Sequence, residues 1–333
     1  MLRGLDHNRP TNTSVELERE DNMASVSVIV PSYNYARYLK ERIRSIQKQT
    51  TQDYDLLIVD DASSDDCPRI LEDYRKDDGI VVQTYSSNSG GVYNRRNELA
   101  AAAKGEWLWF AEADDSAHPE FLETLLNLTH LQPNVALVHC RLAIIDEAGR
   151  LVSDSVDWDE PTRLHLSADY SAKGYDEAVR LTSGCFFASS SGLLINRAAF
   201  LDVGGYDSRL KMAGDWDLYV RLMCKYDSVY TERPLAYYRT HSASVTKKSI
   251  GILRTMEDAY CVINAYGHLV QDSRVSEADK ALMAHRLKGR LFDMFVARKS
   301  ELLQSHRFVL ERLQEVAPDP RAEACLAAIP QAA

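Results

Sequence analysis

Short apolar runs alternate with helical patterns from Val26 onward, and this alternation restricts the chain to an α/β fold. The first run covers Val26 to Val30 and the next covers Leu56 to Val59, which predicts two strands. Between them, apolar residues recur at helical spacing from Tyr38 to Gln47. A strand, a helix and a second strand at this spacing predict a βαβ unit, with a right-handed crossover and a parallel strand pair.

The alternation continues far enough to predict an open, mostly parallel central sheet flanked by helices. A helix at 67–76, a strand at 80–82, a helix at 95–103 and a strand at 107–111 follow in order. Binding sites in such sheets lie beyond the carboxyl ends of the strands. Asp60-Asp61, residues 86–91 and the run Glu112 to Asp115 all lie at such ends, so we expect them to converge on one cleft.

The second half of the chain combines further strands and helices with a helical C-terminal extension. We predict helices at 121–131 and 215–224, strands at 135–139 and 192–195, and loop with small elements at 146–172. Beyond residue 245 the pattern is helical at 249–265 and 276–313, and Ser276 to Asp279 resembles a capping box. The predicted organisation is a flexible leader at 1–23, a main domain at 24–245 and a helical region at 246–333.

Charge and cysteine content argue against several classes of protein. The formal net charge of -10 argues against nucleic acid as the main partner, because phosphate backbones select basic surfaces. The 6 cysteines are scattered singly, so we expect free thiols in a reducing compartment rather than a disulfide framework or a zinc site. The chain opens with no charged-then-apolar leader, and no apolar stretch reaches the roughly 20 residues that cross a bilayer. We therefore expect a cytoplasmic protein that at most contacts the inner face of a membrane.

The acidic run Glu112-Ala113-Asp114-Asp115 is the strongest chemical signal in the chain. It follows a strand predicted to be buried on both faces, and a carboxylate cluster at a strand end is suited to a divalent cation. A bound cation reverses the local charge and lets the cluster bind the oxygens of a diphosphate. We expect Asp114 to be a direct ligand, and Glu112 a second ligand or a partner of a ribose hydroxyl. The alternative for Asp114 and Asp115 is a turn that caps the helix beginning near Pro119.

Three other segments at strand ends are candidates for binding a nucleotide. Pro31 to Asn34 offers an aromatic ring and backbone amides to a nucleobase, or forms a plain turn, and Pro31 argues against a central ladder position there. Asp60-Asp61 can reach a base N–H or a ribose hydroxyl, while the residues after it can cap a helix. Asn88 to Gly91 with Arg95-Arg96 can form a phosphate cradle, and the alternative is a solvated arginine pair.

An acid and a histidine in the second half are candidates for chemistry. Asp217 and Arg221 are four residues apart on a predicted helix and can pair, which leaves Asp215 on a different face. A carboxylate at the rim of a cleft suits a general base, and the alternative is a favourable charge at a helix N-terminus. His241 can complete a metal shell or contact phosphate, although a lone histidine is more often structural.

Taken in order, these motifs resemble family 2 glycosyltransferases, which have the GT-A fold. The resemblance covers residues 26–245, and it implies a Rossmann-like sheet in which residues 24–120 bind a nucleotide sugar and residues 121–245 bind the acceptor. The segments that carry it are Val28 to Asn34, Ile58 to Ser63, Gly90-Gly91 with Arg96-Asn97, Glu112 to Asp115, Gly204 to Asp207, Asp215 with Arg221, and Tyr238 to His241.

The same resemblance implies an inverting transferase that uses a nucleoside-diphosphate sugar, with a UDP-sugar favoured, and Mn2+ or Mg2+. It assigns the metal to Asp114, Glu112 and His241, and it assigns the general base to Asp215. Gly214 and Trp216 then lie on the acceptor side. The nucleotide-sugar site contains Pro31, Tyr33, Asn34, Asp61, Gly91, Arg96, Glu112, Ala113 and Asp114, with Tyr33 and Asp61 at the base.

Two positions depart from the usual family pattern, and two other functions remain open. Glu112 replaces the first aspartate of the Asp-x-Asp motif, and Gly214 stands where an acid commonly precedes the base. We expect transfer to a glycan or lipid-linked glycan of bacterial surface polysaccharides, and a homodimer through the C-terminal helices. The alternatives are a sugar-phosphate nucleotidyltransferase, whose glycine-rich phosphate loop is missing at residues 31–34, and a non-catalytic module that binds nucleotide sugars.

Overall fold

The first half of the chain forms the parallel βαβ units that its periodicity predicts. The computed structural model describes residues 25–77, 79–156, 160–242, 252–296 and 306–328, so the predicted leader lies outside the described part. The elements are β1 (Val26–Ser32), α1 (Ala36–Gln47), β2 (Tyr54–Asp60), α2 (Cys67–Tyr74), β3 (Ile80–Thr84), α3 (Val92–Ala102) and β4 (Trp107–Phe110). β1 pairs in parallel with both β2 and β4, and all of its residues are buried.

Pro31 lies inside β1, although a proline is not expected in a central strand. Its register partner is Val59 in β2. On the other side of β1, the ladder with β4 ends where Ile29 pairs with Phe110. Because β4 has no residue opposite Pro31, the missing N–H of the proline leaves no gap in that ladder. Pro31 was predicted to lie outside a central ladder. That prediction is wrong, because Pro31 pairs with Val59 near the end of a central strand.

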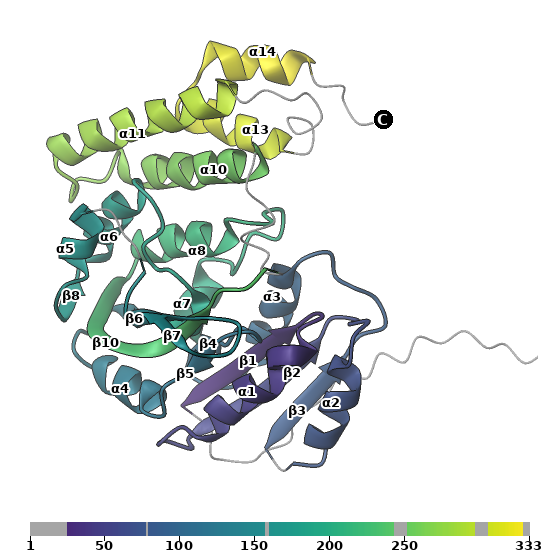
Figure 1. Cartoon of the computed structure of the whole chain (residues 1–333). Helices are drawn as coiled ribbons and strands as arrows, with labels where there is room; N and C mark the ends of the chain where they lie inside the picture. The colour runs from purple at the N-terminus through teal and green to yellow at the C-terminus, as the bar shows by residue number, and fades with distance from the viewer. Residues whose placement is uncertain (1–24, 78, 157–159, 243–251, 297–305, 329–333) are drawn as a thin grey trace, which may run out of the picture.

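The second half completes a mixed sheet. It contains β5 (Ser116–Ala117), α4 (Phe121–Leu128), β6 (Val135–Ile145), β7 (Leu151–Ser153), α5 (Glu160–His165), β8 (Tyr170–Ala172), α6 (Gly174–Leu181), η1 (Ser190–Gly192), β9 (Leu193–Asn196), α7 (Arg197–Asp202), α8 (Gly214–Met223) and β10 (Asp227–Arg239). Within the described residues the sheet has 10 strands, in the order β3-β2-β1-β4-β9-β6-β10-β5, with β7 beside β6 and β8 beside β10 (Figure 1). β9 is antiparallel to its neighbours, whereas β6 and β10 are parallel.

Strand β10 is the largest difference from the predicted elements. Its apolar pattern is interrupted from Glu232 to Pro234, where its register with β6 shifts. A bulge of this kind breaks the period of two by which a strand is recognised. β6 also continues past its predicted end at His139, to Ile145. These two long strands bring Arg239 and the nearby His241 to the acidic run at the end of β4.

The C-terminal region is helical, with α10 (Ile252–Leu269), α11 (Glu277–Val296), α13 (Arg307–Val316) and α14 (Pro320–Ala328). The stretch predicted to be helical at 276–313 contains α11 and the first part of α13, and residues 249–251 and 297–305 of the predicted helical stretches lie outside the described part. Ser276 Oγ accepts a hydrogen bond from the N–H of Asp279 at 3.1 Å, which confirms the predicted cap of α11. None of the described helices combines the length and the apolar character that a membrane span requires.

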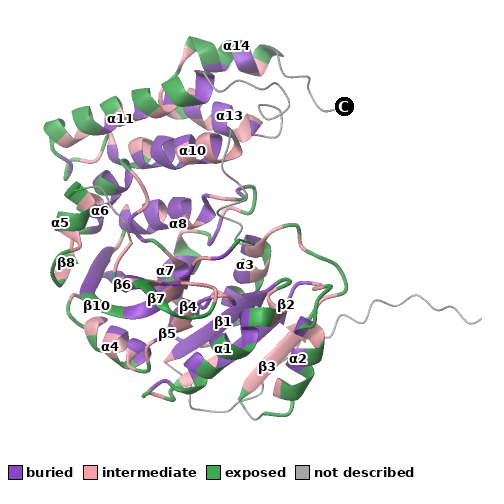
Figure 2. Ribbon diagram, viewed as in Figure 1, coloured by how far each residue is buried: buried purple, intermediate pink, exposed green. Residues whose placement is uncertain are grey.

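Buried side chains form two clusters, one on each face of the sheet. Figure 2 shows buried residues along the central strands and on α8 and α10. α1, α2 and α4 contribute to the first cluster. α3, α6, α7 and α8 contribute to the second, which continues into α10, α11 and α13. The C-terminal helices, which stack on α6 and α8 in Figure 1, thus share a core with the strands that end at the candidate site.

Candidate active site

Two loops meet at the carboxyl ends of β1 and β2. Asn34 and Ala62 both adopt left-handed backbone conformations, with φ of 60° and 64°. The Asn34 side chain accepts hydrogen bonds from the N–H groups of Ser64 at 2.8 Å and Asp65 at 3.3 Å, so it ties the two loops together. Strained backbone persists only where surrounding contacts fix it, and it is frequent at binding sites. Tyr33 in the same loop is 47% exposed, which leaves its ring accessible to a ligand.

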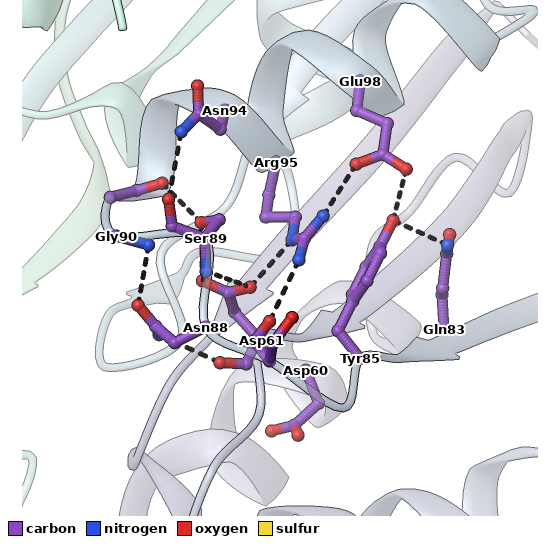
Figure 3. Close-up of polar contacts among 12 residues, drawn as sticks. Asp60, Asp61, Gln83, Tyr85, Asn88, Ser89, Gly90, Asn94, Arg95 and Glu98 are labelled. Carbon is purple, nitrogen blue, oxygen red and sulfur yellow. Dashed lines mark hydrogen bonds and ion pairs between the residues drawn. The ribbon is translucent and has the colours of Figure 1, made fainter. Parts of the chain in front are cut away.

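Asp61 holds the loop between β3 and α3 (Figure 3). Its buried carboxylate accepts hydrogen bonds from Ser89 N–H at 3.0 Å, Ser89 Oγ at 2.7 Å and Arg95 Nε at 2.7 Å. Arg95 also lies 3.3 Å from the centre of the Tyr85 ring and bonds Glu98 at 3.0 Å. The Asp61 carboxylate, which was predicted to contact a nucleobase, instead binds Ser89 and Arg95 and so fixes the conformation of this loop.

Lys211 reaches the same loop from the other half of the molecule. Its Nζ donates a hydrogen bond to the Gly90 carbonyl at 3.2 Å. A Cβ placed on Gly91, the residue before α3, would lie 3.6 Å from this Nζ. The sequence gives no signal for this contact, because the two segments are 121 residues apart. An exposed cation thus stands beside the glycine loop that was predicted to receive phosphate.

The two aspartates after β4 have different surroundings. Asp114 is partly exposed, and its Oδ2 lies 2.9 Å from His241 Nε2. Asp115 is 1% exposed, and its Oδ1 accepts the Arg239 N–H at 2.9 Å. Burial and the neighbouring Asp114 carboxylate raise the pKa of Asp115 to about 7. Asp115 therefore anchors the acidic run to β10, whereas α4 begins after Glu120 without a side-chain cap.

Arg96 is the centre of the site rather than a surface cation. Its side chain is 3% exposed, and Nη1 donates to Asp215 Oδ1 at 2.8 Å while Nη2 bonds Glu112 Oε1. The guanidinium lies 5.7 Å from the Tyr93 ring centre and 5.3 Å from that of Tyr206. The phosphate contact predicted for Arg96 does not fit this burial. Instead, Arg96 joins the first acid of the donor motif to the predicted base.

A run of hydroxyl groups orients the acidic motif, and it was not predicted. Ser190 Oγ donates to Glu112 Oε1 at 2.6 Å, and Ser191 Oγ accepts the Glu112 N–H at 3.0 Å. Ser189 Oγ donates to Asp115 Oδ2 at 3.3 Å. Three consecutive serines before a glycine are the available signal, but hydroxyl runs are common in ordinary loops. Their importance follows from β9, which places η1 beside the end of β4.

Asp215 lies in the first turn of α8 with its side chain 35% exposed. Its Oδ2 is 3.5 Å from the Tyr93 hydroxyl. Asp217 is buried and pairs with Arg221 at 2.6 Å, which confirms that Asp215 and Asp217 face different directions. Trp216 is 3% exposed and donates its indole N–H to a carbonyl of α6, so it packs in the core instead of facing an acceptor.

Gly214, also predicted on the acceptor side, is buried against Tyr93. A Cβ on Gly214 would lie 2.5 Å from the Tyr93 ring. The position therefore has no room for the acid that commonly precedes the base in related sequences. Tyr93 fills this space and stacks on Tyr206, with ring centres 4.9 Å apart.

The predicted metal trio does not converge. Within the described residues there is no group of three His, Cys, Asp or Glu side chains that could hold a metal ion. Glu112 is held by Arg96 and Ser190, whereas Asp114 and His241 form a separate pair. A carboxylate oxygen beside an imidazole nitrogen fits a divalent cation that takes its remaining ligands from substrate oxygens. The pair of Asp114 and His241 therefore suits a metal, and Glu112 does not belong to that pair.

A sequence model of the family described as Glycosyl transferase family 2 matches residues 27–204, which is more than half of the chain. The chain belongs to this family. An uncharacterized glycosyltransferase of Rickettsia typhi is 27% identical over 234 residues, which cover 70% of this chain and 69% of the relative. The protein is therefore a glycosyltransferase, as the ordered motifs imply.

Two solved glycosyltransferases have the same fold. TarS of Staphylococcus aureus, in complex with UDP-GlcNAc, is 19% identical with a TM-score of 0.65, over 91% of this chain and 84% of that chain. The mannosyltransferase PcManGT of Pyrobaculum calidifontis, in complex with GDP-Man and Mn2+, is 15% identical with a TM-score of 0.55, over 92% and 79%. The fold of this glycosyltransferase is GT-A, which confirms the prediction.

Proposed function

We propose that this glycosyltransferase moves a sugar, with inversion, from a nucleoside-diphosphate sugar to an acceptor hydroxyl. The observation that carries the proposal is the network in which Arg96 joins Glu112 to Asp215. Glu112 belongs to the donor motif and Asp215 to the acceptor half, and both carboxylates bond the Arg96 guanidinium. A donor and an acceptor bound on either side of this cation would have their reacting atoms close together.

Asp215 is the proposed general base. Arg96 binds Oδ1, and Oδ2, which lies 3.5 Å from the Tyr93 hydroxyl, is the oxygen proposed to take the proton of the acceptor hydroxyl. The deprotonated oxygen attacks the anomeric carbon, the bond from that carbon to the diphosphate breaks, and the diphosphate leaves with the bonding electrons. A single displacement of this kind inverts the configuration at the anomeric carbon. Arg96 holds the carboxylate in place during the attack.

The donor is proposed to be a UDP-sugar that lies across the ends of β1, β2 and β4. The accessible Tyr33 ring is the proposed contact of the base, and the Asp61 loop, with Gly91 and Lys211, would lie along the diphosphate. The complex of TarS with UDP-GlcNAc supports this choice of nucleotide. Pro31, Asn34 and Ala113 are also proposed to line the donor site.

Mn2+ or Mg2+ is the proposed cofactor, and Asp114 and His241 would hold it. A bound cation supplies neutralisation of the charge that develops on the leaving diphosphate. His241 is 2% exposed, and its Nδ1 has no hydrogen-bond partner in the described part of the chain. The complex of PcManGT with Mn2+ supports a divalent metal in this fold. The acceptor is proposed to be a glycan or lipid-linked glycan of a bacterial surface polysaccharide, met at the inner face of the membrane.

Two substitutions test the proposal. Asp215→Asn should abolish transfer and leave binding of UDP intact, because the amide cannot accept the proton. Asp114→Asn should weaken UDP binding in the presence of Mn2+ and leave metal-free binding unchanged. Both are measured by calorimetry and by release of UDP from UDP-sugars with a panel of acceptors. Asp66→Asn, at an exposed aspartate of α2's N-terminus, is the matched control and should change neither. Full transfer by Asp215→Asn would refute the base assignment.

A further inference from the structure

Helix α10 of the C-terminal region presents a row of polar side chains to α8 and to the segment that leads into it. Glu257, Tyr260 and Asn264 lie at helical spacing on one side of α10. The Tyr260 hydroxyl accepts a hydrogen bond from Arg209 Nη2 at 2.8 Å, and Asn264 Nδ2 donates to Asp217 Oδ1 at 2.7 Å. Such directional contacts fix the register of two elements more tightly than apolar packing does.

Glu257 makes the most extensive of these contacts. Its carboxylate accepts three consecutive backbone N–H groups, from Lys211 at 2.8 Å, Met212 at 2.7 Å and Ala213 at 2.8 Å. These groups directly precede α8, whose first turn carries Asp215. A carboxylate at this place also faces the positive end of the α8 dipole. Glu257 thus fixes, from a distant helix, the backbone that enters α8, whose own N-cap residue makes no side-chain hydrogen bond.

Glu257 is fully buried, and its hydrogen bonds compensate for the loss of hydration. The residue is 0% exposed, and a buried carboxylate is tolerated only where hydrogen bonds and charge compensate for its lost hydration. Burial alone would raise the pKa of Glu257, but His306, whose Nε2 lies 3.5 Å from Oε1, and the three N–H groups lower it below the usual value. The side chain therefore stays ionised at neutral pH.

The same segment is fixed on its other sides by the site itself. Tyr93 packs against Gly214, and the Lys211 side chain reaches the Gly90 carbonyl. From the C-terminal region, Glu257 binds three N–H groups of this segment and Cys261 Sγ lies 3.5 Å from the Ala213 carbonyl, so loss of the Glu257 contacts would shift the start of α8 relative to Arg96 on α3. We infer that Glu257 is a positioning residue: it holds residues 211–213 so that Asp215 can bind Arg96 and face the acceptor. This inference rests on the proposed role of Asp215.

Glu257→Gln tests the inference. The variant keeps one oxygen acceptor but turns an NH2 group toward backbone N–H donors. We expect kcat for transfer to fall by about 10- to 100-fold, because small displacements of a catalytic group cost this much. KM for the donor and the affinity for UDP with Mn2+ should change much less than kcat, because Lys211 is the one proposed donor-site residue that Glu257 binds and the other donor-site residues lie on other elements. Glu257→Asp keeps the charge and should recover part of the lost kcat.

Two further variants separate positioning from general stability. Leu287→Ala removes buried side-chain volume on α11 without touching the segment before α8, and it should lower the melting temperature with little change in kcat. Glu277→Gln is the same substitution at an exposed position of α11 and should change nothing. Loss of kcat in Leu287→Ala as large as in Glu257→Gln, or kcat of Glu257→Gln within twofold of the wild type, would overturn the inference.

Hydrogen exchange makes the result independent of the transfer assay. The N–H groups of residues 211–213 should exchange faster in Glu257→Gln than in the wild type, while those of β1 keep their protection. Unchanged exchange at 211–213 would overturn the inference whatever the activity. If exchange is faster but Asp215→Asn transfers sugar at the full rate, then the assignment of Asp215 fails and the positioning role fails with it. If Asp215→Asn is inactive and Glu257→Gln exchanges normally, only the role of Glu257 fails.

Discussion

At the residue scale, the two departures from the usual family pattern act on the same arginine. Glu112 is one methylene longer than the usual aspartate, and its carboxylate bonds Arg96. Gly214 leaves space for the Tyr93 ring, which stacks on Tyr206 beside the Arg96 guanidinium. A buried arginine requires charge partners and ring faces around it. The two unusual residues are therefore explained together, as parts of the environment that keeps Arg96 between the donor motif and Asp215.

Gly214→Ala should disturb this environment. The new Cβ would lie 2.5 Å from the Tyr93 ring, so the ring or the start of α8 must move. We expect a loss of about 1–3 kcal/mol in the free energy of unfolding and slower transfer, measured by urea unfolding and by UDP release. Gly289→Ala in α11 is the control, because its Cβ meets nothing within 4 Å. An alanine there should stabilise the protein by up to about 1 kcal/mol, and equal effects of the two variants would contradict the prediction.

His139 gives a pH dependence to stability. Burial, and then the nearby His165, hold the pKa of His139 well below its usual range. The unfolded chain takes up a proton at this side chain below about pH 6.5 and the folded chain does not, so stability present above that pH is lost as pH falls. His139→Gln removes this dependence. From pH 7 to 5.5, the difference in free energy of unfolding between variant and wild type should shift in favour of the variant by about 1 kcal/mol.

The check on this prediction is urea unfolding over the same pH interval. His130→Gln changes an exposed histidine and should lose stability in parallel with the wild type. If the free energy of unfolding of His139→Gln and of the wild type changed in parallel with pH, the neutral form of His139 would not be favoured in the folded protein.

At the element scale, periodicity predicted the elements far better than it predicted the partners of side chains. The first four strands and their helices follow from alternation, and β10 does not, because its bulge at Glu232 to Pro234 hides the period. Asp114 and His241 are adjacent as their motifs suggest. The hydrogen-bond partners of Asp61, Arg96 and Trp216 could not be predicted, because each partner is a side chain or carbonyl that the fold brings from a distant segment.

The loop between β3 and α3 offers a test of what Asp61 does. If its carboxylate shapes the loop through Ser89 and Arg95, Asp61→Asn should lower the affinity for UDP, GDP and ADP by a similar factor. We expect a loss of about tenfold for each of these nucleotides that the wild type binds. If Asp61 instead touches the base, only one nucleotide should lose affinity. Calorimetry with the three nucleotides and Mn2+ decides between these outcomes. Asp66→Asn serves again as the matched control, because its side chain is exposed and pairs only with Arg69 among the described residues.

At the scale of the whole molecule, the predicted boundary near residue 245 does not divide the hydrophobic core. One buried cluster contains Ile29 of β1, Leu218 of α8, Val262 of α10 and Leu313 of α13. Polar contacts cross the same boundary, as in the three hydrogen bonds to Glu257. The C-terminal helices therefore behave as part of the catalytic unit, and the predicted homodimer through them remains a prediction.

Removal of residues 243–333 should therefore abolish folding rather than release an active core. The shortened chain would expose the buried faces of α6 and α8, and apolar surface of that extent promotes association. We expect the fragment to aggregate or to lack a cooperative thermal transition, whereas the full chain should unfold in one transition by calorimetry. The measurements are circular dichroism on heating, binding of a hydrophobic dye and size-exclusion chromatography. A monomeric fragment that melts cooperatively and binds UDP would show that the helices are dispensable, and it would also remove the structural basis for the role inferred for Glu257.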